Sequence, residues 1–209
     1  LGYQKFFVWV MIASIPSFFR KETPVLPTAP DLAETEDIQI TADIKAKAIE
    51  LGKNPVQIHQ WLKNTIEYIP SYGSIQGSDL TYQTKRGNAT DIASLEIALL
   101  RAAGIPARYV RGTIELPITK AQNWVGGVTT PEAVQSLLAQ GGIPNIGITS
   151  GGKIQTIRLE HTWVEAWVQY YPSRGAKHVG GVTQGDTWVP LDASYKQYTY
   201  ASGMDLKSK

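Results

Sequence analysis

The chain of 209 residues contains no cysteine. This absence excludes a disulfide framework, a thiolate metal site and thiol catalysis in the sequence as it stands. It does not identify a cellular compartment, because proteins without cysteine occur on both sides of a membrane.

Histidine is scarce as well. The three histidines, His59, His161 and His178, are scattered and have no partners at the spacing of metal ligands, so we assign no metal site. The Gly-Gly pairs do not stand between a strand and a helix with a following lysine, as a phosphate-binding loop requires, and we interpret them as turns. We therefore expect that the chain uses no cofactor.

Long apolar runs and concentrated charge are also missing. The run from Phe6 to Phe19 is interrupted by Ser14, Pro16 and Ser17, whereas a membrane-spanning helix needs about 20 apolar residues. It predicts a buried strand or hairpin instead. The formal net charge is only +2 and the basic residues are scattered, so we expect no nucleic-acid partner and no insertion into a membrane.

Apolar residues make up 43% of the chain, which is enough for a substantial core in one domain. The chain starts at Leu1 and ends in a polar segment, so we expect an excised part of a longer protein. Residues 1–36 are expected to form an N-terminal strand or hairpin and a Pro-rich linker. Residues 37–209 predict the main domain, with a Gly-rich insertion at about 117–153 that holds one short helix around 131–142.

Helical patterns come before strand patterns in the main domain. This order favours an α+β fold in which a central buried helix packs on an antiparallel sheet. The helices expected are 41–52, 54–69 and 89–103, and the strands expected are 107–116, 153–171 and 186–195. The residues expected on the buried stripe of the second helix are Val56, Ile58, Trp61, Leu62 and Ile66.

The segment from Gly87 to Gly104 contains the most apolar of these helices. Asn88 is a good N-cap and Asp91 can complete the capping interaction, so Ala89 is predicted to be the first helical residue. Apolar residues cover so much of the helix that most of it is expected to be buried. The free amides and dipole at such an N-terminus would stabilise a thiolate, yet the position holds alanine.

Three motifs stand out in this order: Gly-Asn-Ala-Thr-Asp at 87–91, His-Thr-Trp-Val-Glu at 161–165 and Trp-Val-Pro-Leu-Asp at 188–192. They resemble the motifs of the transglutaminase-like branch of the papain-like cysteine enzymes. The resemblance spans about 40–200 and implies a papain-like fold. In the family, the nucleophilic cysteine stands where this chain has Ala89.

The resemblance also implies roles for site residues. Ala89 would occupy the nucleophile position, His161 would carry the proton, and Asp192 would orient the imidazole. We predict that Nδ1 of His161 lies within hydrogen-bond distance of Asp192. Asn88 and Trp163 are the predicted substrate-binding residues.

The forms of these motifs resemble a narrower group. The Gly-Asn-Ala-x-Asp variant, the insertion "NWVGGVTTPEA" and the ending "GDTWVPLDASYKQY" are similar to those of Cys-less domains that precede YD-repeat (RHS-type) regions in large bacterial proteins. This implies a secreted or cell-surface location.

Structural interpretations stand beside these functional ones. Without the resemblance, His161 would be interpreted as an ordinary core histidine bonded to Asp192. Trp163 and Trp167 fall on the same strand face as His161, where either could line a cleft or fill the core, and core filling is expected for Trp167. Glu165 is expected to be a structural hydrogen-bond acceptor.

Alanine cannot attack a carbonyl, and loss of a triad nucleophile costs a factor on the order of 10⁶ in turnover. One function is therefore an inactive module that binds a polypeptide or amide-bearing ligand, or other domains of its parent protein. The alternative is a Cys-His-Asp acyl-transfer enzyme (protease, amidase or transglutaminase) whose cysteine was mutated to Ala89. A third is catalysis by Thr90 or Ser94, although both point away from the direction of Ala89 on the helix.

Overall fold

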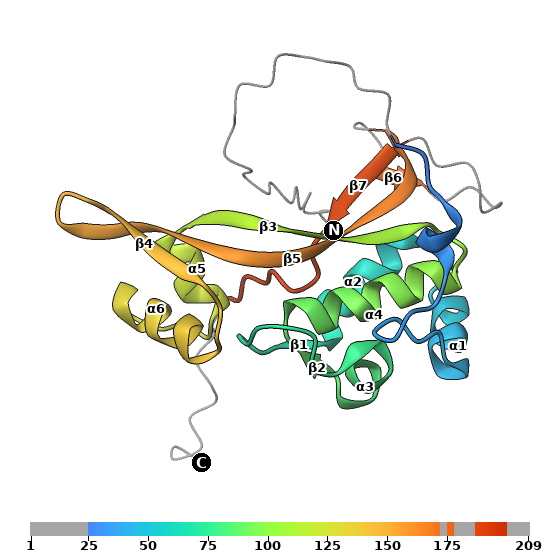
Figure 1. Cartoon of the computed structure of the whole chain (residues 1–209), viewed down its shortest axis with the longest axis horizontal. Helices are drawn as coiled ribbons and strands as arrows, with labels where there is room; N and C mark the ends of the chain where they lie inside the picture. The colour runs from blue at the N-terminus through green and yellow to red at the C-terminus, as the bar shows by residue number, and fades with distance from the viewer. Residues whose placement is uncertain (1–24, 172–174, 178–186, 200–209) are drawn as a thin grey trace, which may run out of the picture.

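A computed structural model of the chain describes residues 25–171, 175–177 and 187–199 (Figure 1). The strand or hairpin predicted at the N-terminus falls on residues 1–24, which lie outside the described residues. Residues 25–37 are mostly exposed and contain one short 3-10 helix, η1 (Ala29–Leu32).

The main domain consists of helices followed by an antiparallel sheet, so the predicted α+β class is confirmed. The helices are α1 (Ala42–Glu50), α2 (Pro55–Thr65), α3 (Gly77–Thr84), α4 (Ala89–Ala102), α5 (Ile118–Trp124) and α6 (Pro131–Gln140). The strands are β1 (Glu67–Tyr68), β2 (Arg86–Gly87), β3 (Ala107–Pro117), β4 (Asn145–Ser150), β5 (Lys153–Tyr171), β6 (Gly175–Lys177) and β7 (Thr187–Leu191). Within the described residues, no helix is long and apolar enough to cross a membrane.

The first two long helices begin at their predicted caps. The side chain of Thr41 accepts a hydrogen bond from the amide of Ile44, and Pro55 is the first residue of α2. The predicted stripe of α2 is wrong at Val56, which is 37% exposed, whereas Ile58 and Leu62 are buried. The reason is that Val56 lies about 200° around the helix from Ile58 and therefore faces the opposite side.

The sheet is built around β5, the longest strand. β3 pairs with β5 in an antiparallel ladder from Ala107 opposite Ala166 to Pro117 opposite Thr156. The second edge of β5 is shared by two shorter strands, because β4 pairs with it up to Leu159 and β7 pairs with it from Val164 onward. A gap in pairing therefore lies between these two strands, at the middle of β5.

Helix α4 is the centre of the core. Its residues from Asp91 to Arg101 are all buried, and its apolar side chains belong to one cluster that also contains residues of α1, α2, the sheet and the insertion. Figure 1 shows α4 beneath the sheet, with α1, α2 and α3 around it. The predicted packing of a central buried helix on an antiparallel sheet is confirmed.

The insertion is more structured than the sequence pattern indicates. One helix was expected there, but the segment contains α5 and α6 and also β4, which forms a hairpin with β5. Helix α5 was missed because it is only one or two turns long, although it buries Ile118, Ala121 and Trp124 at helical spacing. Figure 1 shows α5 and α6 beneath the hairpin, on the same side of the sheet as α4.

Candidate functional site

The site begins at the start of α4. The side chain of Asn88 accepts a hydrogen bond from the Asp91 amide at 2.9 Å, and a carboxylate oxygen of Asp91 accepts one from the Asn88 amide at 3.5 Å. This reciprocal cap makes Ala89 the first residue of the helix, as predicted. The Asn88 side-chain amide also donates to the carbonyl oxygen of Gly73 at 2.7 Å, so this residue joins the helix start to the preceding turn.

Asp91 has a second role that the sequence pattern does not reveal. Its carboxylate is buried, and Oδ1 accepts hydrogen bonds from the backbone amides of Ile75 at 3.0 Å and Gln76 at 2.9 Å. These bonds fix the turn before α3 against the start of α4. The linear sequence carries no signal for them, because the turn lies about 15 residues upstream of Asp91.

His161 and Asp192 form a buried pair. The distance from His161 Nε2 to Asp192 Oδ2 is 2.8 Å, and His161 is 5% exposed. The two residues meet as predicted, but the predicted ring nitrogen is wrong, since Nε2 rather than Nδ1 makes the bond. Asp192 follows β7, which pairs with β5 from Val164 onward, so the carboxylate approaches the end of the ring that is farther from the backbone.

This pairing assigns different roles to the two ring nitrogens. A carboxylate only accepts hydrogen bonds, so Nε2 of His161 carries a proton and donates to Asp192. Among the described residues, Nδ1 has no hydrogen-bond partner. Burial raises the pKa of Asp192, but the positive charge of His161 and the hydrogen bonds from His161, Ser194 and the Tyr195 amide outweigh it and lower the pKa to about 2.

A small cavity joins the helix start to this pair at the gap in the pairing of β5. Its volume is about 20 Å³, room for about one water molecule. Ala89 and His161 both line it, so the predicted nucleophile position and the histidine border the same space. The lining residues are Tyr68, Ser71, Tyr72, Gly73, Ala89, Thr90, Ile143, Glu160, His161 and Thr162.

Aromatic rings enclose the imidazole. Trp124 meets His161 edge to face at 5.4 Å between ring centroids, and Trp163 lies nearly parallel to it at 6.3 Å. Trp124 comes from the insertion, and its indole nitrogen donates to the carbonyl oxygen of Ser194 at 2.8 Å. No sequence motif marks Trp124 as a site residue, because its contact with His161 arises only when the insertion folds back onto the domain.

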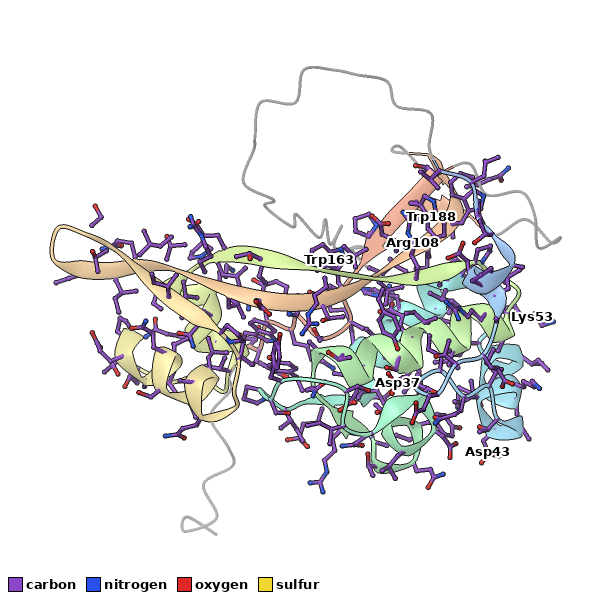
Figure 2. The ribbon with its side chains drawn as sticks, in the orientation of Figure 1. Asp37, Asp43, Lys53, Arg108, Trp163 and Trp188 are labelled. Atoms are coloured by element: carbon purple, nitrogen blue, oxygen red, sulfur yellow. The ribbon has the colours of Figure 1, made fainter. Side chains whose placement is uncertain are left out.

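Other predicted residues take structural positions. Trp167 is buried, but it packs edge to face on Trp188 at 5.4 Å and lies outside the apolar cluster around α4, so it does not fill that core. Glu165 accepts hydrogen bonds from Arg108, the shorter at 2.8 Å, as expected of a structural acceptor. Figure 2 shows Arg108 and Trp188 together on the side of the sheet away from α4, where the guanidinium lies 4.0 Å from the ring centroid.

The possible substitute nucleophiles are engaged elsewhere. The Ser94 hydroxyl lies 2.8 Å from the Tyr109 hydroxyl and also bonds the backbone of Thr90. The Thr90 hydroxyl lies 3.4 Å from that of Thr162. In the part of the chain that the structure describes, neither hydroxyl is bonded to His161.

Comparisons with known proteins agree with the motifs. Residues 38–193 match the family model of the transglutaminase-like superfamily. The uncharacterized protein ML0607 of Mycobacterium leprae is 31% identical over 50% of this chain and 37% of its own length. The uncharacterized protein YebA of Bacillus subtilis is 27% identical over 76% of this chain and 19% of its own length. The chain thus spans well under half of these curated relatives.

Among solved structures, the chain is similar to the periplasmic domain of TgpA from Pseudomonas aeruginosa. The identity is 21% and the TM-score is 0.40, with 79% of this chain and 46% of that chain covered.

Proposed function

Because this chain belongs to the transglutaminase-like superfamily, we propose that it is a catalytically inactive member that binds a polypeptide or amide-bearing ligand in the cavity beside Ala89. The observation that carries the proposal is the methyl group of Ala89 at the helix start, in a cavity that is also lined by His161, whose Nδ1 has no hydrogen-bond partner among the described residues. A ligand carbonyl could be held there, but no side chain at position 89 can attack it. Neither of the predicted substrate-binding residues lines the cavity: Trp163 stacks beside the imidazole, and Asn88 holds Gly73 at the cavity wall, so both would contribute by positioning the site.

A second function is favoured by the intact pair. The 2.8 Å bond between His161 and Asp192 is the geometry that an acyl-transfer enzyme needs, so Ala89 could replace the cysteine of an active protease, amidase or transglutaminase. The codon for residue 89 in the native gene distinguishes the two functions, since a cysteine codon would favour the enzyme.

The proposal is tested by restoring a thiol. In the Ala89→Cys variant, the helix start and His161 should stabilise the thiolate and lower the pKa of the thiol. We would measure its rate of alkylation by iodoacetamide between about pH 5 and 9, alone and combined with His161→Ala. The chain has no other cysteine, so the signal is specific. Ala46→Cys, on the exposed face of α1, is the matched control.

Fast labelling at pH values well below the free-thiol pKa of about 8.5 would support a preserved catalytic frame, provided that it is lost in the variant that also carries His161→Ala. Hydrolysis of an amide substrate by Ala89→Cys would go further and favour the mutated-enzyme alternative. Labelling with the same pH dependence as the α1 control would contradict both, because the cavity would then give the thiol no special environment.

The proposal extends to the parent protein. We propose a domain of a larger bacterial protein, secreted or at the cell surface, that precedes a YD-repeat region and docks on other parts of that protein. The forms of the 87–91 motif and of the insertion support this placement by their resemblance to such domains. Cleavage of the parent protein by a protease added to intact cells is the expected result, and full protection would contradict it.

A further inference from the structure

Two residues on different walls of the cavity are bonded to each other. Tyr72 lies in the turn before α3, and Glu160 lies on β5 directly before His161. The Tyr72 hydroxyl donates to Glu160 Oε2 at 2.5 Å, and both residues line the cavity. Tyr72 is 38% exposed whereas His161 is 5% exposed, so this bond lies on the solvent side of the cavity.

Arg111 holds this bridge from outside. Its guanidinium donates to the Tyr72 hydroxyl and lies 5.1 Å from the centroid of the Tyr72 ring. The bond to Glu160 is the main cause that raises the pKa of Tyr72, followed by burial, and together they outweigh the opposing effect of Arg111, which keeps the hydroxyl protonated as a donor. Arg111 is exposed and does not itself line the cavity, so Glu160 is the charged residue nearest to a ligand there.

The bridge limits what can reach Ala89. Tyr72 and Glu160 both line the cavity, whose volume is about 20 Å³, so a ligand larger than a water molecule must displace lining side chains to reach Ala89. Opening the bond between Tyr72 and Glu160 would supply this room. The freed carboxylate of Glu160 accepts hydrogen bonds but cannot donate one, and its charge repels anions.

We propose that Glu160 determines which ligands the cavity admits, with Tyr72 as the gate that covers it. The cavity then takes ligands that present an N–H donor or a positive charge beside the bound carbonyl, and it rejects anionic ligands of the same shape. This inference rests on the proposed function, because it assumes that ligands bind beside Ala89 and His161. It adds to that proposal the residue that selects the ligand and the charge of the ligands that are rejected.

The experiment compares two small reagents of nearly equal size. In the Ala89→Cys variant at pH 7, iodoacetamide and iodoacetate each form a thioether and release iodide, but one carries a neutral amide and the other a carboxylate. The ratio of their rates in the folded protein is divided by the same ratio in urea, where the thiol is free of the cavity. We expect this normalised ratio to favour iodoacetamide in the folded protein.

Adding Glu160→Gln should lower the normalised ratio by roughly three- to tenfold, the effect of one charge a few ångströms away. Glu115→Gln is the matched control, since it removes a partly exposed carboxylate on β3 that pairs with Arg158 and does not line the cavity. It should leave the ratio unchanged. Adding Tyr72→Phe should raise both rates and keep the preference for iodoacetamide.

The inference is overturned if Glu160→Gln leaves the ratio unchanged, or if the folded protein prefers iodoacetate, which would mean that Arg111 dominates the entrance. A Tyr72→Phe variant that labels no faster than its parent would overturn the role of Tyr72 as a gate. The ratio tests this inference, whereas the loss of fast labelling in His161→Ala tests the proposed function. The two can therefore fail separately.

Discussion

At the scale of single residues, the site depends on two buried carboxylates with different partners. Asp192 orients the His161 ring, and Asp91 joins the start of α4 to the turn before α3. Neither is exposed to water, so each depends on hydrogen bonds to replace its lost hydration. Removing the charge of either one should therefore change the stability of the domain in a way that removing the charge of an exposed carboxylate does not.

Asp192 should make the stability of the domain depend on pH in acid. Its pKa is lowered to about 2 in the folded chain, against an ordinary value of 3.8. The unfolded chain therefore binds the proton more tightly, so the contribution is complete above about pH 4 and is lost as the pH falls toward 2. The loss should be about 2 kcal/mol in the free energy of unfolding.

Urea unfolding between pH 7 and pH 2 measures this contribution. The Asp192→Asn variant should lose less stability than the native chain over the acid range, while the exposed Asp43→Asn on α1 should follow the native chain. Parallel curves for the native chain and Asp192→Asn would show that His161 does not hold the carboxylate as described.

Asp91→Asn should destabilise the domain by about 1 to 3 kcal/mol. The new amide keeps the shape of the side chain but weakens its bonds to the Ile75 and Gln76 amides, and it turns a donor toward the Asn88 amide. Thermal unfolding measures the effect, with Asp43→Asn again as the control. An unchanged midpoint would contradict the role of Asp91 in fixing the turn.

At the scale of elements, the insertion positions the wall that carries Tyr72. The backbone amide of Tyr72 donates to the carbonyl oxygen of Gly141 at 2.9 Å, at the end of α6. A Cβ added to Gly141 would lie 1.9 Å from the carbonyl oxygen of Pro70, so only glycine permits this approach. The end of α6 and the Tyr72 turn therefore fit together backbone against backbone.

Gly141→Ala should push these two elements apart. The backbone of Gly141 has φ −74°, which suits alanine, so the effect is steric and should cost about 1 to 3 kcal/mol. In the Ala89→Cys background it should also speed alkylation, because Tyr72 is displaced from Glu160. Gln140→Ala, exposed on the same helix, is the control. Equal labelling rates in the two variants would refute the link between α6 and the gate.

At the scale of the whole molecule, the insertion and the main domain share one core. Trp124, Val134 and Leu138 of the insertion belong to the same buried cluster as the side chains of α4. The stacked pair of Trp124 and Tyr68, 4.7 Å between ring centroids, joins the insertion to β1 directly. We therefore expect the described domain to unfold as one unit.

Leu138→Ala should lower the stability of the whole domain by about 2 to 5 kcal/mol, because it leaves a cavity in this shared core. The unfolding transition measured by far-UV circular dichroism and the one measured by tryptophan fluorescence should shift by the same amount. Leu80→Ala, on the exposed side of α3, should shift neither transition by much. Two separated transitions in Leu138→Ala would mean that the insertion folds independently.

The sequence alone determined the features that depend on neighbouring residues. The cap formed by Asn88 and Asp91 sets Ala89 at a helix start, and the alternation along β5 sets His161 on a strand, because these preferences act within a few residues. The order of the three motifs was enough to indicate that His161 and Asp192 would meet. It also led to the prediction that Ala89 stands at the position of the family's nucleophile.

The tertiary structure decided which atoms meet. The path of β7 brings Asp192 to Nε2 of His161, the folding of the insertion brings Trp124 to the imidazole, and the contact of Gly141 with the Tyr72 turn brings Tyr72 to Glu160. Each contact joins segments that are distant in sequence. Packing across the whole core is what brings the two segments of each contact together. Local preferences cannot specify such contacts, because a small change in the path of one connecting segment would remove them.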